Sequence, residues 1–334
     1  MIEVKNLVKK YGNHLAVDHL NFTIEEGHIY GFLGPNGAGK STTMNIMTGY
    51  LGATEGEVLI NGHDILKEPE EAKKQIGYLP ELPPLYMDMT VREYMEFAAE
   101  LKKIPKAKRA ESIDDVEKLV KIKDVEKRLI KNLSKGYRQR VGLAQAVLGF
   151  PEIIILDEPS VGLDPKQIIE IRELIRKLAK KHTVILSSHI LAEVREVCDY
   201  IMIISKGKLV ASDTPENLER NLGDSDLIEI ETKADPDEVR RILETVDGIR
   251  SISTKHLENG ITWAQIQEKK NTDVREKVFQ AFAQNHQPLL KLNPLQVSLE
   301  DVFMELTQSD RAAEEYAEKA KKKETEDMKD AGDL

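Results

Sequence analysis

The sequence lacks three features that would place a protein outside the cell or across a membrane. It has a single cysteine, Cys198, so an intrachain disulfide is impossible and a reducing compartment fits. No segment approaches the roughly 18 uninterrupted apolar residues that a membrane-spanning helix needs. The N-terminus, MIEVKNLVKKYG, lacks the apolar core of a secretory signal. We therefore expect a chain that contacts a membrane only through an embedded partner.

The sequence also lacks an excess of basic residues. Its 48 Lys and Arg are outnumbered by 58 Asp and Glu, which gives a net charge of −10. Nucleic-acid binding by counterion release needs a clustered excess of Lys and Arg, so the composition argues against nucleic acid as the main partner. The contents of charged residues, 32%, and hydrophobic residues, 40%, are typical of a soluble protein, and 334 residues allow two domains.

Residues 1–221 have the pattern of an α/β domain. Alternating residues up to about 60 predict antiparallel strands, and three- and four-residue spacing predicts a helical subdomain at about 88–148. The apolar runs EIIILDE and HTVILSSH are typical of buried parallel strands. A helix between them is predicted to begin with Asp164 as its cap and Pro165 in its first position.

After residue 221 the pattern changes. Residues 222–309 read as strand, helix, strand, strand, helix, strand, which predicts a small ferredoxin-like α+β module. We expect Trp263, Phe279 and Phe282 in its core, and a capping box formed by Ser298 and Asp301. Residues 310–334 are charged and poor in apolar residues, so they are expected to form a disordered tail or a frayed helix.

The stretch GPNGAGKST matches the phosphate loop G-x-x-x-x-G-K-[ST] from Gly34 to Ser41. Its glycines let the backbone turn tightly and point N–H groups at phosphate oxygens. Lys40 is expected to reach the β- and γ-phosphates, and Ser41 to offer a hydroxyl to Mg²⁺. The strand before and the helix after favour this interpretation over an ordinary turn. The predicted nucleotide-binding residues of the loop are Gly34, Pro35, Asn36, Gly37, Ala38, Gly39, Lys40, Ser41 and Thr42.

An acidic pair ends the buried strand of IIILDEP. Asp157 is predicted to hold Mg²⁺ directly or through water, and Glu158 to act as the general base for an attacking water. Two carboxylates at this position are costly without a cation or a shared proton. The alternative, a carboxylate that caps the next helix, is disfavoured by the phosphate loop upstream.

A second helix N-terminus of the kind that binds phosphate is predicted in NLSKGYRQR, at Ser134 and Gly136. A helix N-terminus with free N–H groups attracts anions. Taken alone, this stretch fits almost as well with a serine-capped helix that binds nothing. The phosphate loop already provides one anion site, so these residues alone do not explain why the chain would need a second.

These motifs, together with SSHI, occur in an order and spacing that resembles the ATP-binding cassette (ABC) ATPases over residues 1 to about 220. The chain looks most like the ATP-binding subunits of bacterial exporters whose permease is a separate chain. The resemblance implies a P-loop NTPase of the ABC type, with a RecA-like core, an antiparallel β subdomain and a helical subdomain. It also implies ATP and Mg²⁺ as ligands.

The resemblance implies a use for the second helix start. Two such domains pair head to tail, and each ATP lies between the phosphate loop of one and the signature loop of the other. The signature residues are Leu133, Ser134, Lys135, Gly136 and Tyr137. Lys135 and Tyr137 depart from the common form LSGGQ, whereas Ser134 and Gly136 are kept. Whether the partner is an identical or a related chain stays open.

Further roles follow from the resemblance at single positions. Tyr11 matches the aromatic that stacks on adenine, although a surface tyrosine at a strand end is the alternative. His189 matches the switch histidine at the γ-phosphate, and Asp164 matches the loop that communicates across the dimer. Glu81 stands where the family usually has a glutamine near Mg²⁺. The apolar loop after it is expected to receive the permease, with local packing as the alternative; it contains Leu82, Leu85, Tyr86 and Met87.

The sequence thus predicts an ATPase subunit of a membrane exporter, with Glu158, His189 and Lys40 as catalytic residues. It would lie on the cytoplasmic face of the cell membrane through transmembrane permease subunits. One alternative is a soluble ABC-type ATPase of translation or DNA repair, but those usually have two cassettes or long coiled coils. Another is a regulatory module that binds ATP without hydrolysis, which Glu158 and His189 argue against. The sequence indicates neither the cargo nor, beyond analogy, the direction of transport.

Overall fold

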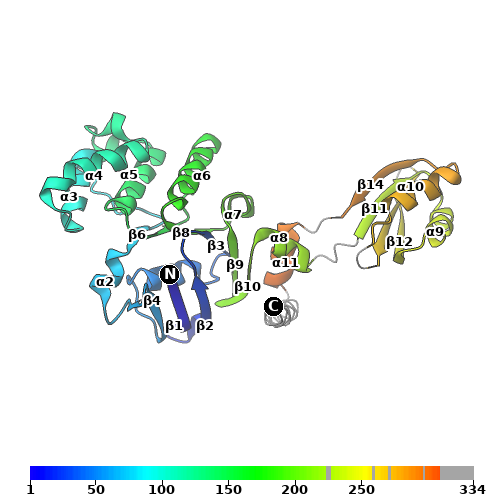
Figure 1. Cartoon of the computed structure of the whole chain (residues 1–334), viewed down its shortest axis with the longest axis horizontal. Helices are drawn as coiled ribbons and strands as arrows, with labels where there is room; N and C mark the ends of the chain where they lie inside the picture. Colours follow the sequence, from blue (N-terminus) through cyan, green and yellow to red (C-terminus); the bar gives the residue numbers. More distant parts are fainter. Residues whose placement is uncertain (223–226, 258–259, 270–271, 296–297, 309–334) are drawn as a thin grey trace, which may run out of the picture. The chain divides into compact units, whose positions relative to one another are not determined.

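The computed structural model describes residues 1–222, 227–257, 260–269, 272–295 and 298–308. They divide into two compact units (Figure 1), one comprising Met1–Pro215 and residues 303–308, the other Glu216–Val302. The division and the predicted boundary at residues 221–222 both fall within α8 (Pro215–Leu222). The predicted tail, 310–334, lies outside the described residues. None of the described helices is long and apolar enough to cross a bilayer.

The central sheet of the first unit positions the motifs. Its strands lie in the order β10-β9-β3-β8-β7-β6, with β10 antiparallel and the others parallel. Every residue of β3, β7 and β8 is buried, as expected for parallel strands covered on both faces. The register pairs Leu33 with Ser188 and Asp157 with Ser187, so the phosphate loop, the acidic pair and His189 follow adjacent strand ends. The strands are β3 (Ile29–Leu33), β6 (Ile76–Leu79), β7 (Ile153–Asp157), β8 (Thr183–Ser188), β9 (Tyr200–Ser205) and β10 (Lys208–Asp213).

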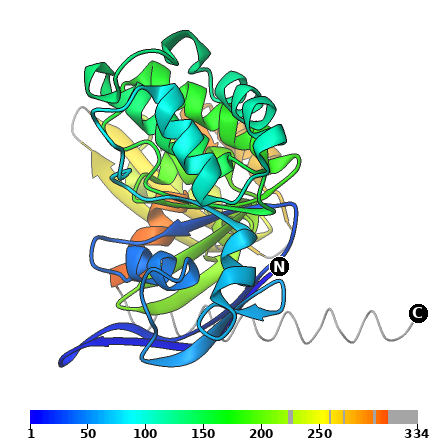
Figure 2. The same ribbon diagram turned by 90° about the vertical axis from the view of Figure 1, so that its left-hand side faces the viewer.

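A second, antiparallel sheet contains the N-terminal strands. Its order is β2-β1-β4-β5, formed by β1 (Ile2–Tyr11), β2 (His14–Ile24), β4 (Glu55–Ile60) and β5 (His63–Asp64). One buried cluster joins Leu7 and Ile60 of this sheet to Phe32 and Ile155 of the central sheet and to Met44 of α1 (Lys40–Met47). The two sheets therefore share a core around α1, the helix that follows the phosphate loop (Figure 2).

The remaining helices of the first unit include the predicted helical subdomain. It contains α3 (Val91–Leu101), α4 (Lys106–Leu119), α5 (Lys135–Val147) and the short turns η1 (Lys123–Val125) and η2 (Ile130–Asn132). Outside it lie α2 (Pro69–Lys74), α6 (Pro165–Ala179) and α7 (Leu191–Val197).

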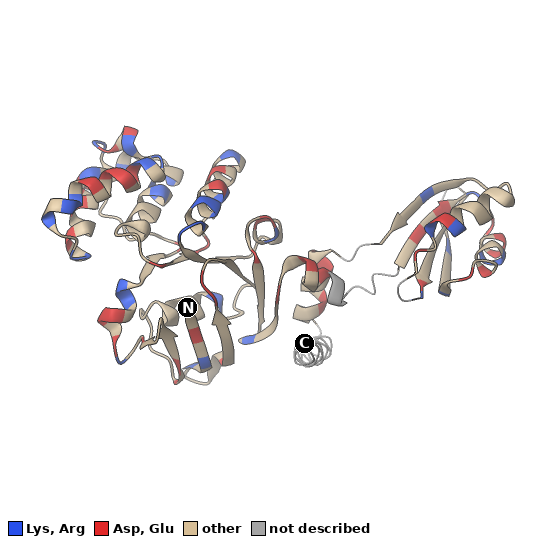
Figure 3. Ribbon diagram, viewed as in Figure 1, with Lys and Arg blue, Asp and Glu red and all other residues tan. Residues whose placement is uncertain are grey.

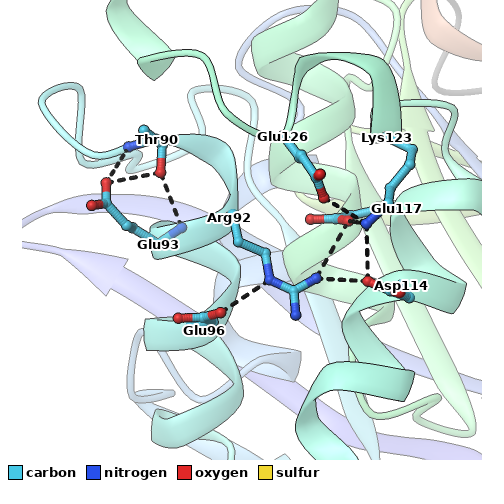
Figure 4. A network of polar contacts seen from close by, with 8 residues as sticks. All are labelled: Thr90, Arg92, Glu93, Glu96, Asp114, Glu117, Lys123 and Glu126. Atoms are coloured by element: carbon cyan, nitrogen blue, oxygen red, sulfur yellow. Dashed lines mark hydrogen bonds and ion pairs between the residues drawn. The ribbon is translucent and has the colours of Figure 1, made fainter.

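An ion-pair network holds this subdomain together (Figure 4). Glu117 of α4 is fully buried, and Lys123 Nζ lies 3.1 Å from its Oε2. Arg92 of α3 contacts the same carboxylate at 3.7 Å and Asp114 at 2.6 Å. Because a buried carboxylate is strongly destabilising without its partner, these contacts fix α3, α4 and η1 relative to one another beside α5.

The second unit has the predicted element order: β11 (Leu227–Thr232), α9 (Pro236–Glu244), β12 (Ile249–Leu257), β13 (Ile261–Glu268), α10 (Arg275–Gln284) and β14 (Leu289–Pro294). Its antiparallel strands lie in the order β12-β13-β11-β14. Buried residues of β11 and β13, such as Ile230 and Ile266, pack with Leu243 of α9 and Phe282 of α10. Both helices therefore cover the same face of the sheet.

Two expectations about this core are wrong. Trp263 is only partly buried, because its neighbours Thr262 and Ala264 point to the helix-covered face and successive strand residues point to opposite faces. Its Nε1 donates to Glu229 Oε2 at 3.2 Å. Phe279 is 58% exposed, whereas Phe282, predicted correctly, is 1% exposed.

The last described helix, α11 (Leu299–Gln308), begins as predicted. The Ser298 hydroxyl accepts from Asp301 N at 3.3 Å, and the Asp301 carboxylate accepts from Ser298 N at 3.1 Å. This is the reciprocal arrangement of a capping box. The face that carries Leu299, Val302 and Leu306 is buried.

Candidate functional site

The phosphate loop joins β3 to α1, and the N-terminus of α1 has no side-chain cap. Gly37 and Gly39 have φ angles of 80° and 105°, in the region that side chains rarely adopt. A Cβ on Gly39 would lie 2.6 Å from the carbonyl oxygen of Ala16, so no larger residue fits. No side chain caps α1, which leaves its first N–H groups available to an anion.

Lys40 is held inside this loop. Its side chain is buried, and Nζ donates to the carbonyl oxygens of Gly34 at 2.6 Å and Pro35 at 3.2 Å. Burial lowers the pKa of the Lys40 ammonium, while the carboxylates of Glu158 and Asp157 act in the opposite direction. A bound phosphate would supply negative charge at this buried cation.

The acidic pair lies beside the loop. The Ser41 hydroxyl is 3.4 Å from Asp157 Oδ1, and Ser187 Oγ donates to the same oxygen at 2.5 Å. Ser187 Oγ also accepts from Glu158 N at 3.0 Å. Glu158 has a φ of 48°, a strained conformation of the kind found at functional sites. One hydroxyl at the end of β8 therefore binds both the carboxylate of Asp157 and the backbone N–H of Glu158.

Glu158 has the environment of a general base. Its Oε2 lies 2.9 Å from His189 Nδ1, within hydrogen-bond distance. Burial raises the pKa of the Glu158 carboxyl, and the contact with His189 acts in the opposite direction. A carboxylate whose pKa is raised toward neutrality accepts a proton more readily.

Lys40, Ser41, Glu158 and His189 share one cleft of about 550 Å³ within the first unit. Tyr11, which is 49% exposed, lies at one edge of it, and Glu81 and His189 also line it. Sequence reasoning missed His14, Ala16 and Val161, which line the same cleft. Their proximity to Tyr11 and Glu158 along the chain was the only signal. The lining residues are Tyr11, His14, Ala16, Asn36, Gly37, Ala38, Gly39, Lys40, Ser41, Thr42, Glu81, Glu158, Val161 and His189.

The oxygen donors here suit Mg²⁺. Ser41, Glu81 and Asp157 all line an adjoining cavity of about 630 Å³. No group of three or more His, Cys, Asp or Glu side chains able to hold a metal occurs within the described part of the chain. Mg²⁺ is usually bound by one or two carboxylates together with substrate phosphates. These residues therefore fit a cation that arrives with a nucleotide.

The signature residues lie outside this cleft. Ser134 caps α5, where its hydroxyl accepts from Tyr137 N at 3.4 Å. Gly136 is buried against Gln167 of α6, and a Cβ there would lie 2.7 Å from that side chain. Asp164 caps α6 in a capping box with Gln167. The predicted signature and dimer residues thus gather on another surface of the same unit.

The loop after Glu81 is apolar and open. Leu82, Tyr86 and Met87 are 79%, 54% and 40% exposed. Tyr86 also packs edge-on against Phe97 of α3, with ring centroids 5.3 Å apart. The loop therefore packs in part on the helical subdomain and still presents apolar surface, and its contact with a permease stays a prediction.

Residues 17–161 match the family described as ABC transporter. YhcH of Bacillus subtilis (strain 168), an uncharacterized ABC transporter ATP-binding protein, is 36% identical over 310 residues, 92% of this chain and 96% of that protein. The similarity therefore extends into the second unit. BcrA of Bacillus licheniformis, a bacitracin transport ATP-binding protein, is 42% identical over 212 residues, 63% of this chain and 68% of that protein.

A solved structure agrees with the first unit. It is the dimeric structure of a post-hydrolysis state of the ATP-binding cassette MJ0796 bound to ADP and Pi. It has a TM-score of 0.59, is 28% identical, and the match covers 64% of this chain and 98% of that chain. With a relative matched over nearly its whole length, and with a phosphate loop that opens into a cleft beside an acidic pair, the chain belongs to the ATP-binding proteins of the ABC transporter family.

Proposed function

We propose that this chain is the ATP-hydrolysing subunit of an exporter and powers a separate membrane permease. The observation that carries the proposal is the cleft in which Lys40, Glu158 and His189 meet, while Ser134 is exposed and does not line it. A site built this way can bind and activate a nucleotide yet lacks the groups that would cover the γ-phosphate. A second subunit would supply them.

In the proposed reaction, Glu158 takes a proton from the water that attacks the γ-phosphate. His189 orients Glu158 and the phosphate, and Lys40 leaves the carbonyl oxygens of its own loop to contact the β- and γ-phosphates. Mg²⁺, held through Ser41, Asp157 and Glu81, would neutralise charge on the phosphate oxygens. Tyr11 would stack on the adenine, since its ring lies at the edge of the cleft.

The partner subunit's Ser134 and the N–H groups beside Gly136 would close the site from the other side. A head-to-tail pair with a two-fold axis forms two such sites. The N-terminus of α5 would contribute partial positive charge toward the phosphate. Asp164, close to this surface, would respond to the partner.

Export is proposed from the relatives. BcrA is named for bacitracin transport and SrtF of Streptococcus pyogenes for lantibiotic transport. The exposed loop of Leu82, Leu85, Tyr86 and Met87 would receive the permease on the cytoplasmic face of the membrane. Nucleic acid is not a proposed partner.

We propose that residues 222–309 form a ferredoxin-like accessory domain, next to a nucleotide-binding domain of residues 1–221. The strand order β12-β13-β11-β14 and the two helices on one face support this fold. A role in contacts between the two subunits and a role in regulation are both compatible with such a module.

The transport proposal is tested at the apolar loop. We expect the tagged chain to copurify with its co-expressed permease from washed, detergent-solubilised membranes. Leu82→Asp should abolish copurification and leave ATP binding intact, because a charge would be buried at the contact. Leu66→Asp is the matched control, since Leu66 is also exposed, at 52%, but lies elsewhere. Recovery of the wild-type chain in the soluble fraction alone would favour the soluble ATPase alternative.

A second prediction concerns Glu81, which lines the cleft in place of the usual glutamine. Glu81→Gln is expected to keep ATP hydrolysis and to raise the Mg²⁺ concentration for half-maximal activity, because it removes one negative ligand charge. The measurement is an ATPase titration with Mg²⁺ at fixed ATP. Superimposable titrations of the two proteins would contradict the role of Glu81 at the metal.

A further inference from the structure

A buried carboxylate behind the cleft has no part in the reaction described above. Glu193 of α7 is 6% exposed. Its Oε2 accepts from Ser160 Oγ at 2.5 Å and from Ser188 Oγ at 3.3 Å. Its Oε1 accepts no hydrogen bond from the described residues and lies 4.0 Å from Arg172 Nη2. One oxygen of Glu193 thus connects two serines that are far apart in the sequence.

Both serines lie next to residues of the proposed reaction. Ser188 immediately precedes His189, and its Oγ also accepts from Ile190 N at 3.0 Å, which shapes the loop around the histidine. Ser160 lies two residues after Glu158 and begins the segment that leads to Asp164. The carbonyl oxygen of Ser160 accepts from Leu163 N at 3.1 Å. Glu193 therefore links the His189 loop to the segment between Glu158 and Asp164.

The end of β8 makes this link specific. Ser187 and Ser188 are adjacent strand residues and point to opposite faces. Ser187 bonds to Asp157 and Glu158, whereas Ser188 bonds to Glu193. The acidic pair is therefore fixed on one side of the strand, and the position of His189 is fixed from the other.

This arrangement is costly for the fold. A buried carboxylate loses solvation, and one of its oxygens here gains no hydrogen bond in return. Replacing such a group by an apolar side chain of similar volume is often neutral or stabilising. Stability alone therefore does not account for a carboxylate at this position.

We propose that Glu193 is a positioning residue. It holds His189 within hydrogen-bond distance of Glu158 and couples the position of His189 to the segment that ends at Asp164. Movement of that segment on dimer formation would then be transmitted to the histidine through one carboxylate. The inference rests on the proposed ATP hydrolysis and adds a residue that does not line the cleft.

The test compares Glu193→Leu with the wild-type full-length chain in steady-state ATP hydrolysis. Loss of both acceptor contacts should lower kcat by roughly ten- to a hundredfold, since small displacements of catalytic groups have effects of this size. The KM for MgATP should stay within about twofold, because the phosphate loop is untouched. Glu193→Gln keeps a carbonyl acceptor for the two serines and should retain most of the activity.

A pH profile separates positioning from a general structural role. Burial raises the pKa of Glu158 and the contact with His189 opposes that rise, so loosening the contact lets the pKa rise further. The proton-accepting form of Glu158 then requires a higher pH. The acid limb of kcat in Glu193→Leu is expected to move to higher pH, whereas mere loss of folded protein would scale the profile without moving it.

The matched control is Glu196→Leu. Glu196 lies on the same helix and also pairs with Arg172, but it contacts neither serine. Its kcat should stay within about twofold of wild type, because Glu196 is exposed and bonds to neither serine. Equal losses in Glu193→Leu and Glu196→Leu would overturn the proposal, as would a wild-type kcat and acid limb in Glu193→Leu.

If Glu193→Leu does not fold, Ser188→Ala tests the positioning role instead. It removes one hydroxyl and should lower kcat with an unchanged KM; an unchanged kcat overturns the proposal. Failure of the underlying function looks different: the wild-type chain would then hydrolyse no ATP, with or without its permease. An active wild type with an unaffected Glu193→Leu chain overturns the positioning role alone.

Discussion

Glu158→Gln is expected to lower ATP hydrolysis by at least about 100-fold while ATP binding persists. Glutamine has nearly the same size but cannot accept the proton of the attacking water. Lys40, Ser41 and the glycine backbone of the phosphate loop stay in place in the cleft. Because the nucleotide would bind and not be cleaved, a dimer with MgATP should accumulate. Steady-state ATPase assays and sedimentation with and without MgATP measure the two effects.

Glu111→Gln is a matched control for this variant, because Glu111 is an exposed carboxylate of α4. It should leave both hydrolysis and sedimentation as in the wild type. Undiminished hydrolysis by Glu158→Gln would remove Glu158 as the base. A variant that stays strictly monomeric with MgATP, both alone and with its permease, would contradict the shared site.

Two inactive variants are expected to restore activity when they are paired. Lys40→Ala removes the phosphate-loop cation, and Ser134→Asp places a negative charge where the γ-phosphate of the other subunit would lie. Aspartate is also a good helix cap, so α5 should still begin normally. Each variant alone should be inactive at both sites of its dimer.

In a mixed head-to-tail dimer, one site combines both defects and the other has Lys40 from one chain with Ser134 from its partner. One intact site of two predicts about half of the wild-type activity per dimer. Co-expression with two different affinity tags and sequential purification isolates the mixed dimer. A pair of differently tagged Lys40→Ala chains is the control. A mixed dimer as inactive as that pair would show that the two residues do not serve the same site.

Much of the site could be predicted because its signals are local. The phosphate loop is nine consecutive residues whose glycines adopt the conformations that the motif needs, such as the φ of 105° at Gly39. Helix starts were equally readable, since Ser134 and Asp164 bond to N–H groups three residues away. The position of Asp157 was also predictable, because it is the last residue of the buried strand IIILD.

The parts that were missed depend on distant pairings. Figure 3 shows both signs of charge on the helices of both units, so charge patterning did not single out Glu193 from the other acidic residues. Its proposed role becomes visible only when β7, β8 and α7 bring Ser160 and Ser188 to the carboxylate of Glu193. His14 and Val161 likewise entered the cleft through the packing of separate segments.

The sequence alone was sufficient to predict the motifs, the helix caps and the buried strands. These features depend on periodicity and on contacts between residues a few positions apart. Tertiary structure decided that Trp263 faces away from the helices and that Phe279 stays exposed. It also decided that Lys40 lies in the cleft, whereas the exposed Ser134 of the same chain does not line it. Those outcomes depend on strand register and on which face of each element is covered, and residues remote in sequence determine both.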